Sequence, residues 1–224
     1  SDVVYDLPEK IRSLVRNQAS RTSRHLGQVV SGANSDVIIV SPYFVPRRQG
    51  VDFLAALVRK GVRVVVVTNS LASTNHSSVH AVYARYRKTL LRQGIELYEL
   101  SSHNPATAAD DIADSKLTLH SKVAIVDRSK AFVGSFNLDP RSLFLNTEMG
   151  LAVDCDPIAG EITDAVLGAL PTLAYRLRLT PRSRLTWVQS RTGGETVHRT
   201  EPETRLLRRW LTRLMGLLPI ESQM

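Results

Sequence analysis

Short runs of β-branched residues alternate with stretches of helical periodicity between residues 36 and 100 of this chain. Three compact apolar runs are expected to form strands: residues 36–40, 62–68 and 95–100. Two stretches with apolar positions at helical spacing are expected to form helices: residues 50–60 and 76–92. This alternation predicts an α/β fold, with a mixed, largely parallel sheet that has helices on both faces.

Polar loops follow the first two of these strands and begin at Ser41 and Asn69. The carboxyl ends of parallel strands meet at one edge of a sheet, and ligands usually bind there. Both loops are therefore expected to contribute to a functional site.

The rest of the chain supplies further expected elements. An amphipathic helix is expected over residues 10–30, and another helix over residues 156–170. Additional strands are expected at residues 117–126, 130–134, 147–153, 176–179, 184–189 and 196–198. Residues 1–200 are long enough for a single domain with its own core, followed by a C-terminal helical segment over residues 201–224.

The densest group of chemically versatile residues begins at His120. On a strand, where the side-chain period is two, His120 and Lys122 would point to the same face and could hold a phosphate together. Gly134, Ser135 and Asn137 come directly after another short strand. These are small or polar residues that suit close contact with an oxyanion.

Written as spacings, this group is His-x-Lys, four residues, Asp, six residues, and Gly-Ser-x-Asn. It resembles the HKD signature of the phospholipase D superfamily, whose members cleave or exchange phosphodiesters. The resemblance implies a phospholipase D-like half-domain with four residues in its catalytic motif: His120, Lys122, Asp127 and Glu148. It also implies that phosphate binds at Gly134, Ser135 and Asn137, and that neither a metal nor a cofactor is required.

The resemblance also implies a role for each of the motif's side chains. His120 would attack phosphorus and form a phosphohistidine, or would serve as the general acid and base. Glu148 would accept a hydrogen bond from the imidazole and fix its tautomer. Asp127 would anchor the site rather than take part in the chemistry. Lys122 and backbone N–H groups near Gly134 would screen the phosphate charge.

Four further segments are similar to the second half of bacterial cardiolipin synthases, most closely those of the C type: residues 41–46, 68–72, 79–83 and 217–221. This similarity implies phosphatidyl transfer between phospholipids, in which cardiolipin is made from phosphatidylglycerol and a second phospholipid. The alternative is a phospholipase D-type hydrolase or a single-motif, homodimeric nuclease.

The implied chemistry requires two histidines, one to attack phosphorus and one to protonate the leaving alkoxide. Of the six histidines in the sequence, only His120 is followed two residues later by lysine. The chain is therefore expected to be inactive as an isolated monomer. Its partner would be either a missing N-terminal half that carries the second motif or a second copy of the chain, and the lack of an initiator methionine favours the missing half.

Basic residues are concentrated towards the C-terminus. Residues 175–213 contain ten arginines, no lysine and three acids, and so account for +7 of the net charge of +8. Apolar residues recur at intervals of three and four over residues 203–218, with the arginines largely on other faces. A basic amphipathic helix that contains tryptophan suits the surface of an anionic bilayer. The alternative is a helix docked on the domain with a charged outer face.

No apolar run in the sequence reaches the roughly 20 residues that cross a bilayer. The expected partners are anionic phospholipids and a membrane surface, with the enzyme bound peripherally to the cytoplasmic face of the bacterial inner membrane. Nucleic acid is the less favoured partner, because the basic residues lie on an apolar-striped tail.

Overall fold

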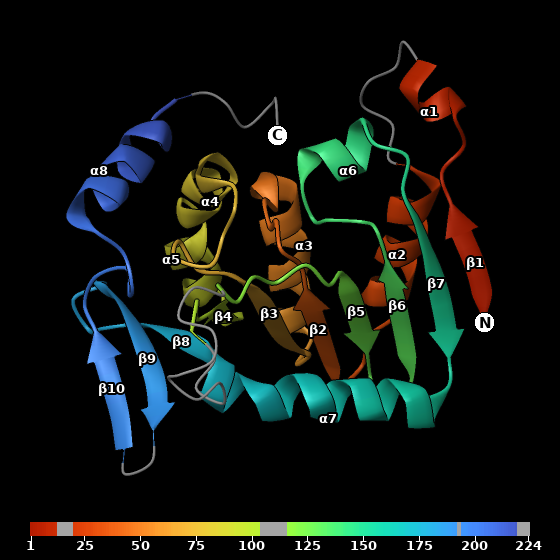
Figure 1. The fold of residues 1–224 in the computed structure, drawn as a ribbon. Helices are drawn as coiled ribbons and strands as arrows, with labels where there is room; N and C mark the ends of the chain where they lie inside the picture. The colour runs from red at the N-terminus through yellow and green to blue at the C-terminus, as the bar shows by residue number, and fades with distance from the viewer. Residues whose placement is uncertain (13–19, 104–115, 192–193, 219–224) are drawn as a thin grey trace.

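The computed structural model describes residues 1–12, 20–103, 116–191 and 194–218 (Figure 1). Within these residues ten strands form one sheet: β1 (Asp2–Tyr5), β2 (Asp36–Val40), β3 (Arg63–Asn69), β4 (Glu96–Leu100), β5 (Val123–Val126), β6 (Lys130–Gly134), β7 (Met149–Asp154), β8 (Ala174–Leu179), β9 (Leu185–Arg191) and β10 (Gly194–His198). Their order across the sheet is β1-β7-β6-β5-β2-β3-β4-β8-β9-β10. The α/β class and the mixed sheet are confirmed.

Parallel pairings are confined to the centre of the sheet, where β2 pairs with β3 and β3 with β4. The other seven of the nine pairings are antiparallel, so the sheet is less parallel than the sequence pattern predicts. Helical crossovers join β2, β3 and β4, and such crossovers connect parallel strands. After β4 the chain returns beside β2 as β5, and β5, β6 and β7 then pair in succession with alternating direction.

Eight helices accompany the sheet in the described part of the chain: α1 (Glu9–Arg12), α2 (Arg21–Ser31), α3 (Arg47–Arg59), α4 (Ser77–Ala84), α5 (Arg87–Arg92), α6 (Pro140–Phe144), α7 (Asp156–Leu173) and α8 (Leu206–Met215). Figure 1 shows α2, α3, α4 and α5 behind the sheet and α7 across its front. The expectation of helices on both faces is therefore confirmed.

The alternation of side chains along the central strands builds a core on each face of the sheet. On β2, Val37 and Ile39 pack into the core beneath α2 and α3, whereas Ile38 and Val40 pack into the core beneath α7. All four side chains are buried, which explains why the strand reads as a continuous apolar run.

Several expected elements differ from the observed ones in extent. The helix expected over residues 10–30 includes α1 and α2, with residues 13–19 between them outside the described part of the chain. The helix expected over residues 76–92 is two helices, α4 and α5. The strand expected from residue 117 begins only at Val123, and β1 and α6 had no sequence prediction. Among the described helices, none is both long enough and apolar enough to span a bilayer.

Candidate active site

An open cavity of about 1110 Å³ lies where the segment before β5 meets the end of β6 and the start of β7. Six of the seven expected site residues line it: His120, Lys122, Gly134, Ser135, Asn137 and Glu148. The structure thus brings together residues as far apart in the sequence as His120 and Glu148, which are separated by 28 positions, because β5, β6 and β7 are neighbours in the sheet. Asp127 is not part of the lining.

His120 and Lys122 precede β5 and do not lie on a strand, so the expected strand geometry is not observed. The side chain of Asn69, at the end of β3, explains why. The N–H of Leu119 donates to Oδ1 of Asn69 at 2.9 Å, and Nδ2 of Asn69 donates to the carbonyl oxygen of Leu119 at 3.1 Å. Because a side chain satisfies both groups, this peptide segment does not extend the ladder of β5. His120 and Lys122 still face the same cavity.

The polar loop after β2 contributes to this site as expected, and so does Asn69, which was expected to begin the second loop and is instead the last residue of β3. Asn69 fixes the residue directly before His120, and Tyr43 of the loop after β2 lines the cavity. Oγ of Ser41 accepts a hydrogen bond from the N–H of Leu138 at 3.3 Å, which ties the first loop to the segment after Asn137.

Gly134 lies where β6 and β7 approach too closely for any side chain. A Cβ atom at this position would lie 2.3 Å from the carbonyl oxygen of Met149. The N–H groups of Gly134 and Ser135 donate to the carbonyl oxygens of Lys122 and Met149, at 3.1 and 2.9 Å. The expectation that these backbone groups bind phosphate is therefore not supported, since both are used to hold the strands together.

Glu148 is buried and accepts hydrogen bonds from two serine hydroxyls. Oγ of Ser142 donates to Oε1 at 2.7 Å, and Oγ of Ser135 donates to Oε2. No hydrogen bond joins Glu148 to the ring of His120 among the residues that the structure describes. The expected contact with the imidazole is therefore replaced by one with Ser135, so that the carboxylate orients the hydroxyl next to the cavity.

The backbone of Glu148 is held by residues that sequence reasoning missed. The N–H of Asp6 donates to the carbonyl oxygen of Glu148 at 2.8 Å, and the N–H of Glu148 donates to Oδ2 of Asp6 at 3.2 Å. Burial opposes ionisation of Asp6, but hydrogen bonds from Lys10, Thr22 and Glu148 outweigh it and lower the pKa of its carboxyl. Asp6 belongs to no motif, and no sequence signal identifies it.

Asp127 lies at the far end of β5 from His120, where the chain turns towards β6. Its carboxylate accepts hydrogen bonds from the backbone N–H groups of Asn34, Ser35 and Asp36, at 2.8 to 3.1 Å. These bonds outweigh the effect of burial and lower the pKa of Asp127 to about 2. Asp127 therefore fastens the start of β2 to the end of β5 and is remote from the other motif residues.

Lys122 is the cation of the cavity. Burial lowers the pKa of its ammonium group, while attraction by Glu148 and Asp139 opposes that shift. Its Nζ donates to the carbonyl oxygen of His120 at 2.6 Å. The positive charge is thus held beside His120, where a phosphate oxygen could replace that carbonyl as the acceptor.

Asn137 lines the cavity and has a buried side-chain oxygen. Its N–H donates to Oγ of Ser142 at 3.2 Å, which fixes the backbone next to Glu148. Its side-chain Oδ1 is buried and has no hydrogen-bond partner within the described residues. A ligand in the cavity could supply the missing donor.

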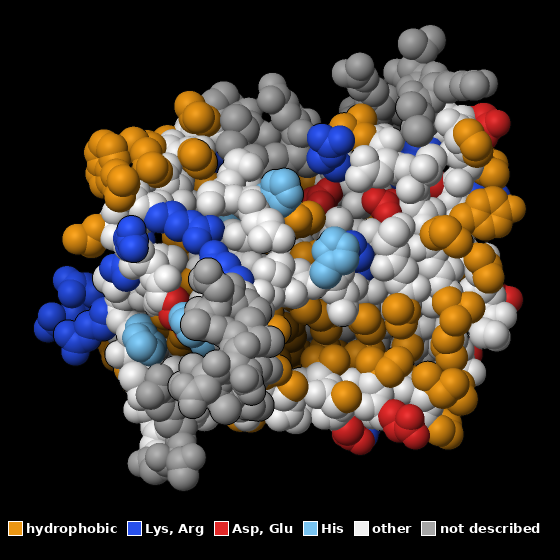
Figure 2. Space-filling view, viewed as in Figure 1, with side chains coloured by type: hydrophobic (Ala, Val, Ile, Leu, Met, Phe, Trp, Pro, Cys, Tyr) orange, Lys and Arg blue, Asp and Glu red, His pale blue; other side chains and the backbone are white. Residues whose placement is uncertain are grey.

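An exposed apolar row forms one wall of the cavity. Strand pairing aligns Val3 of β1 with Leu151 of β7, Leu151 with Val133 of β6, and Val133 with Val123 of β5. All four line the cavity, and three of them are exposed large apolar residues. Figure 2 shows a band of hydrophobic side chains beneath histidines on this face. We refer to these four residues as the apolar row.

Comparison with known proteins identifies the family. Residues 26–166 match the family described as cardiolipin synthase, PLD-like domain. The chain is 39% identical to cardiolipin synthase C of Escherichia coli over 202 residues, which cover 88% of the chain and 43% of that protein. It is 33% identical to cardiolipin synthase A of Pseudomonas aeruginosa over 157 residues, which cover 70% of the chain and 28% of that protein. The chain thus spans less than half the length of these relatives.

Solved structures share the fold at low sequence identity. Nuc from Salmonella typhimurium, a phospholipase D family member, is 20% identical, with a TM-score of 0.57 over 79% of this chain and 97% of Nuc. Phosphatidylserine synthase from Haemophilus influenzae is 14% identical, with a TM-score of 0.57 over 88% of this chain and 41% of that protein. The fold and the sequence agree, and the chain belongs to the family of cardiolipin synthase, phospholipase D-like domains.

Proposed function

We propose that this chain supplies one half of the active site of an enzyme that transfers phosphatidyl groups between phospholipids. The observation that carries the proposal is the single cavity that gathers His120, Lys122, Ser135 and Asn137 around space for a phosphate. Family membership supports phosphodiester chemistry on a phospholipid, and the arrangement of this chain's side chains supports the individual roles.

The proposed reaction proceeds through a phosphohistidine. A ring nitrogen of one motif histidine attacks phosphorus, and the bond from phosphorus to the leaving alkoxide breaks as the second motif histidine gives that oxygen a proton. The second histidine then removes a proton from the acceptor hydroxyl, whose oxygen attacks phosphorus and releases the first histidine. His120 takes one of these two roles. Lys122 and the hydroxyl of Ser135 stabilise charge on the phosphoryl oxygens.

The proposed reaction makes cardiolipin from phosphatidylglycerol and a second phospholipid. Support comes from the identity of 39% to cardiolipin synthase C, which extends over 88% of this chain. The enzyme would work at an anionic membrane surface, bound peripherally to the cytoplasmic face of the bacterial inner membrane.

The second histidine would come from outside these 224 residues. One source is another part of a longer protein, which accords with the 43% of cardiolipin synthase C that the chain matches. The other source is a second copy of the chain. The apolar row supports either one, because exposed apolar side chains next to His120 would be buried by a domain that closes over the cavity.

The test compares His120→Ala with a matched control in the enzyme that carries both motifs. His198, at the end of β10, lies outside the cavity, so His198→Ala is the control. With phosphatidylglycerol vesicles, the parent and the control should form cardiolipin, whereas His120→Ala should form less than about a thousandth as much. A parallel reaction with plasmid in EDTA measures nicking. Nicking without lipid turnover would refute phosphatidyl transfer and favour the nuclease.

A further inference from the structure

Helix α8 packs against the domain with its polar side and turns its apolar side to solvent. Six apolar residues of the helix are exposed: Leu206, Leu207, Trp210, Leu211, Leu214 and Met215. By contrast, the only residue of α8 that is fully buried is Thr212. A helix on the surface of a soluble domain ordinarily buries its apolar stripe. The reversed orientation leaves that stripe without a partner in the described part of the chain, and we call it the α8 stripe.

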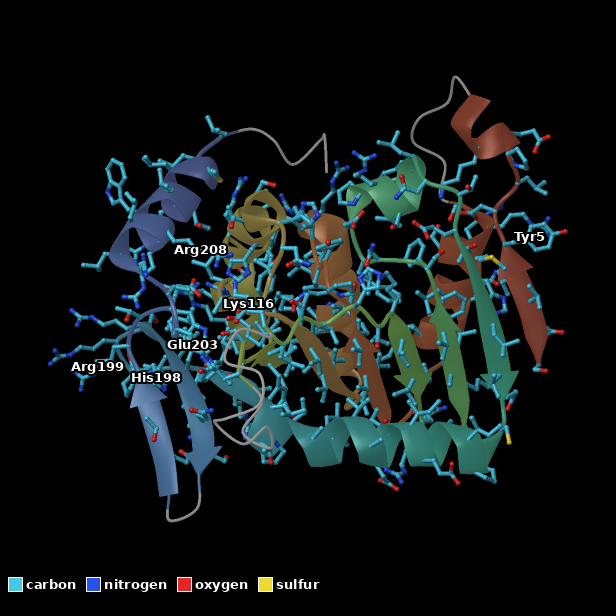
Figure 3. The ribbon with its side chains drawn as sticks, in the orientation of Figure 1. Tyr5, Lys116, His198, Arg199, Glu203 and Arg208 are labelled. Atoms are coloured by element: carbon cyan, nitrogen blue, oxygen red, sulfur yellow. The ribbon has the colours of Figure 1, made fainter. Side chains whose placement is uncertain are left out.

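Contacts on the polar side of α8 hold it against α4. Nη2 of Arg208 donates to the carbonyl oxygen of Thr74 at 3.2 Å and lies 3.4 Å from Oγ of Ser77. Figure 3 shows Arg208 pointing from α8 towards the body of the domain, in the direction of Lys116. At the end of the helix, a Cβ atom on Gly216 would lie 3.2 Å from the carbonyl oxygen of Ala81, so the backbones are close there.

Two carboxylates in the segment before α8 fix where the helix begins. Oε1 of Glu201 lies 2.5 Å from Nη1 of the buried Arg87, whose Nε lies 2.7 Å from Oε1 of Glu99. Glu203 accepts hydrogen bonds from the N–H and Oγ of Ser102, at 2.7 and 2.9 Å. The α8 stripe is therefore presented by a helix anchored at both ends, not by a flexible tail.

Arginines border the α8 stripe, and the helix contains no acid. Arg209 and Arg213 lie beside it, and neither forms an ion pair with a carboxylate among the described residues. A shallow cavity of about 440 Å³ combines both kinds of side chain, since it is lined by Thr200, Leu206, Leu207, Arg209, Trp210 and Arg213. Figure 2 shows hydrophobic side chains gathered over α8 with Lys and Arg side chains below them.

We propose that α8 docks this domain on the surface of an anionic phospholipid bilayer. The α8 stripe enters the boundary between headgroups and acyl chains, with Arg209 and Arg213 at the level of the lipid phosphates. Trp210, which is 61% exposed, suits that depth because indole combines an apolar ring with an N–H donor. Docking takes its lipid partner from the proposed function, but it requires no catalysis by His120.

A second copy of the chain is the less suitable occupant of the α8 stripe. A two-fold contact would place the same surface on both sides, so that the arginines of α8 would face arginines. With no acid on the helix, such a contact gains no compensating ion pair. Lipid phosphates, in contrast, complement these arginines and are present at high density on the bilayer surface.

Tryptophan fluorescence reads out docking directly. The chain has two tryptophans, and Trp187 is only 4% exposed, so a change on binding reports Trp210. Vesicles of phosphatidylcholine with phosphatidylglycerol should shift the emission to shorter wavelength and carry the protein upward in flotation. Vesicles of phosphatidylcholine alone should do neither to a comparable extent.

Two sets of variants separate the apolar and the charged contributions. The double variant Leu206→Glu/Leu207→Glu should weaken vesicle binding at least roughly a hundredfold, because two buried leucines are lost. Each of Arg209→Gln and Arg213→Gln should weaken it about fivefold. Val197→Glu on β10, which is also exposed, and Arg48→Gln on α3 are the matched controls and should bind like the parent.

Three results would overturn the inference. The first is full vesicle binding by the double leucine variant, and the second is equal binding to both kinds of vesicle. The third is a parent protein that binds no vesicles but forms a dimer, with the double leucine variant monomeric. His120→Ala distinguishes docking from catalysis, since it should bind vesicles like the parent. Docking without lipid turnover in the two-motif enzyme would refute only the proposed function. Turnover that persists without docking would refute only the role of α8.

Discussion

Asp127→Asn tests whether Asp127 anchors the fold or takes part in the chemistry. The residue has a φ of 53°, a left-handed conformation that Asn tolerates nearly as well as Asp. The substitution therefore keeps the turn between β5 and β6 while it removes the negative charge and one of the two acceptor oxygens. The hydrogen bonds from Asn34 to Oδ2 are the ones that the amide cannot reproduce.

The magnitude follows from the pKa of about 2, against an ordinary value of 3.8. A difference of this size corresponds to roughly 2.5 kcal/mol of free energy of unfolding. Because Asp127 is only partly buried, screening by solvent reduces the expected loss in Asp127→Asn to about 1–1.5 kcal/mol at pH 7.

Urea denaturation of the parent and of Asp127→Asn, at several pH values, measures this loss. The folded-state pKa lies below the unfolded one, so the stabilisation is complete above about pH 5 and is lost as the pH falls towards 2. The difference between the two proteins should therefore shrink by about half near pH 3. Ser31→Ala, which removes an exposed hydroxyl from α2, should show no such pH dependence.

An equal stability at pH 7, or a difference that stays constant down to pH 3, would refute the linkage. Activity of the two-motif enzyme adds an independent result. An anchor at the far end of β5 should leave most of the phosphatidyl transfer intact below the melting temperature. A loss of more than about a hundredfold in Asp127→Asn would show that this carboxylate acts in the chemistry.

Two further substitutions test the cavity. Gly134→Ala should destabilise the fold by about 1–3 kcal/mol in urea, since a Cβ would meet the Met149 carbonyl at 2.3 Å. Gly27→Ala, where nothing lies within 4 Å, should not, and equal effects would refute the steric account. Asn69→Ala should cost about 1–3 kcal/mol and lower phosphatidyl transfer, because Leu119 loses both hydrogen bonds. Unchanged stability and turnover would show that this contact does not position His120.

The sequence predicts a strand or helix correctly where its bounds follow from which residues are buried. It fails where a side chain from a distant part of the chain determines where the element begins. Residues 36–40 and 130–134 form strands with the expected bounds, because their apolar patterns follow the two cores directly. The segment before β5 carries the same kind of pattern, yet the strand begins only at Val123. The cause is Asn69, a residue 50 positions from Leu119, and no local periodicity encodes that contact.

The motif likewise predicts which residues lie near one another, but not which hydrogen bonds they form. The motif residues from His120 to Asn137 line one cavity, with the exception of Asp127. It does not reveal that Glu148 bonds to serines, because Ser142 lies on α6, a short helix with no sequence prediction. For α8, periodicity identifies an apolar stripe, but only tertiary contacts such as those of Arg208 determine which side faces the domain.

The bonds between Asp6 and Glu148 have a consequence for the order of folding. They join residues 142 positions apart, one at the start of the chain and one beside the cavity. The entropy of closing such a loop has to be overcome before this long-range contact can form, whereas local contacts need no such closure. We therefore expect the carboxylate that orients Ser135 to reach its final position only when β1 pairs with β7. A chain shortened by β1 and Asp6 should keep both cores and leave the backbone of Glu148 without its two hydrogen bonds with Asp6.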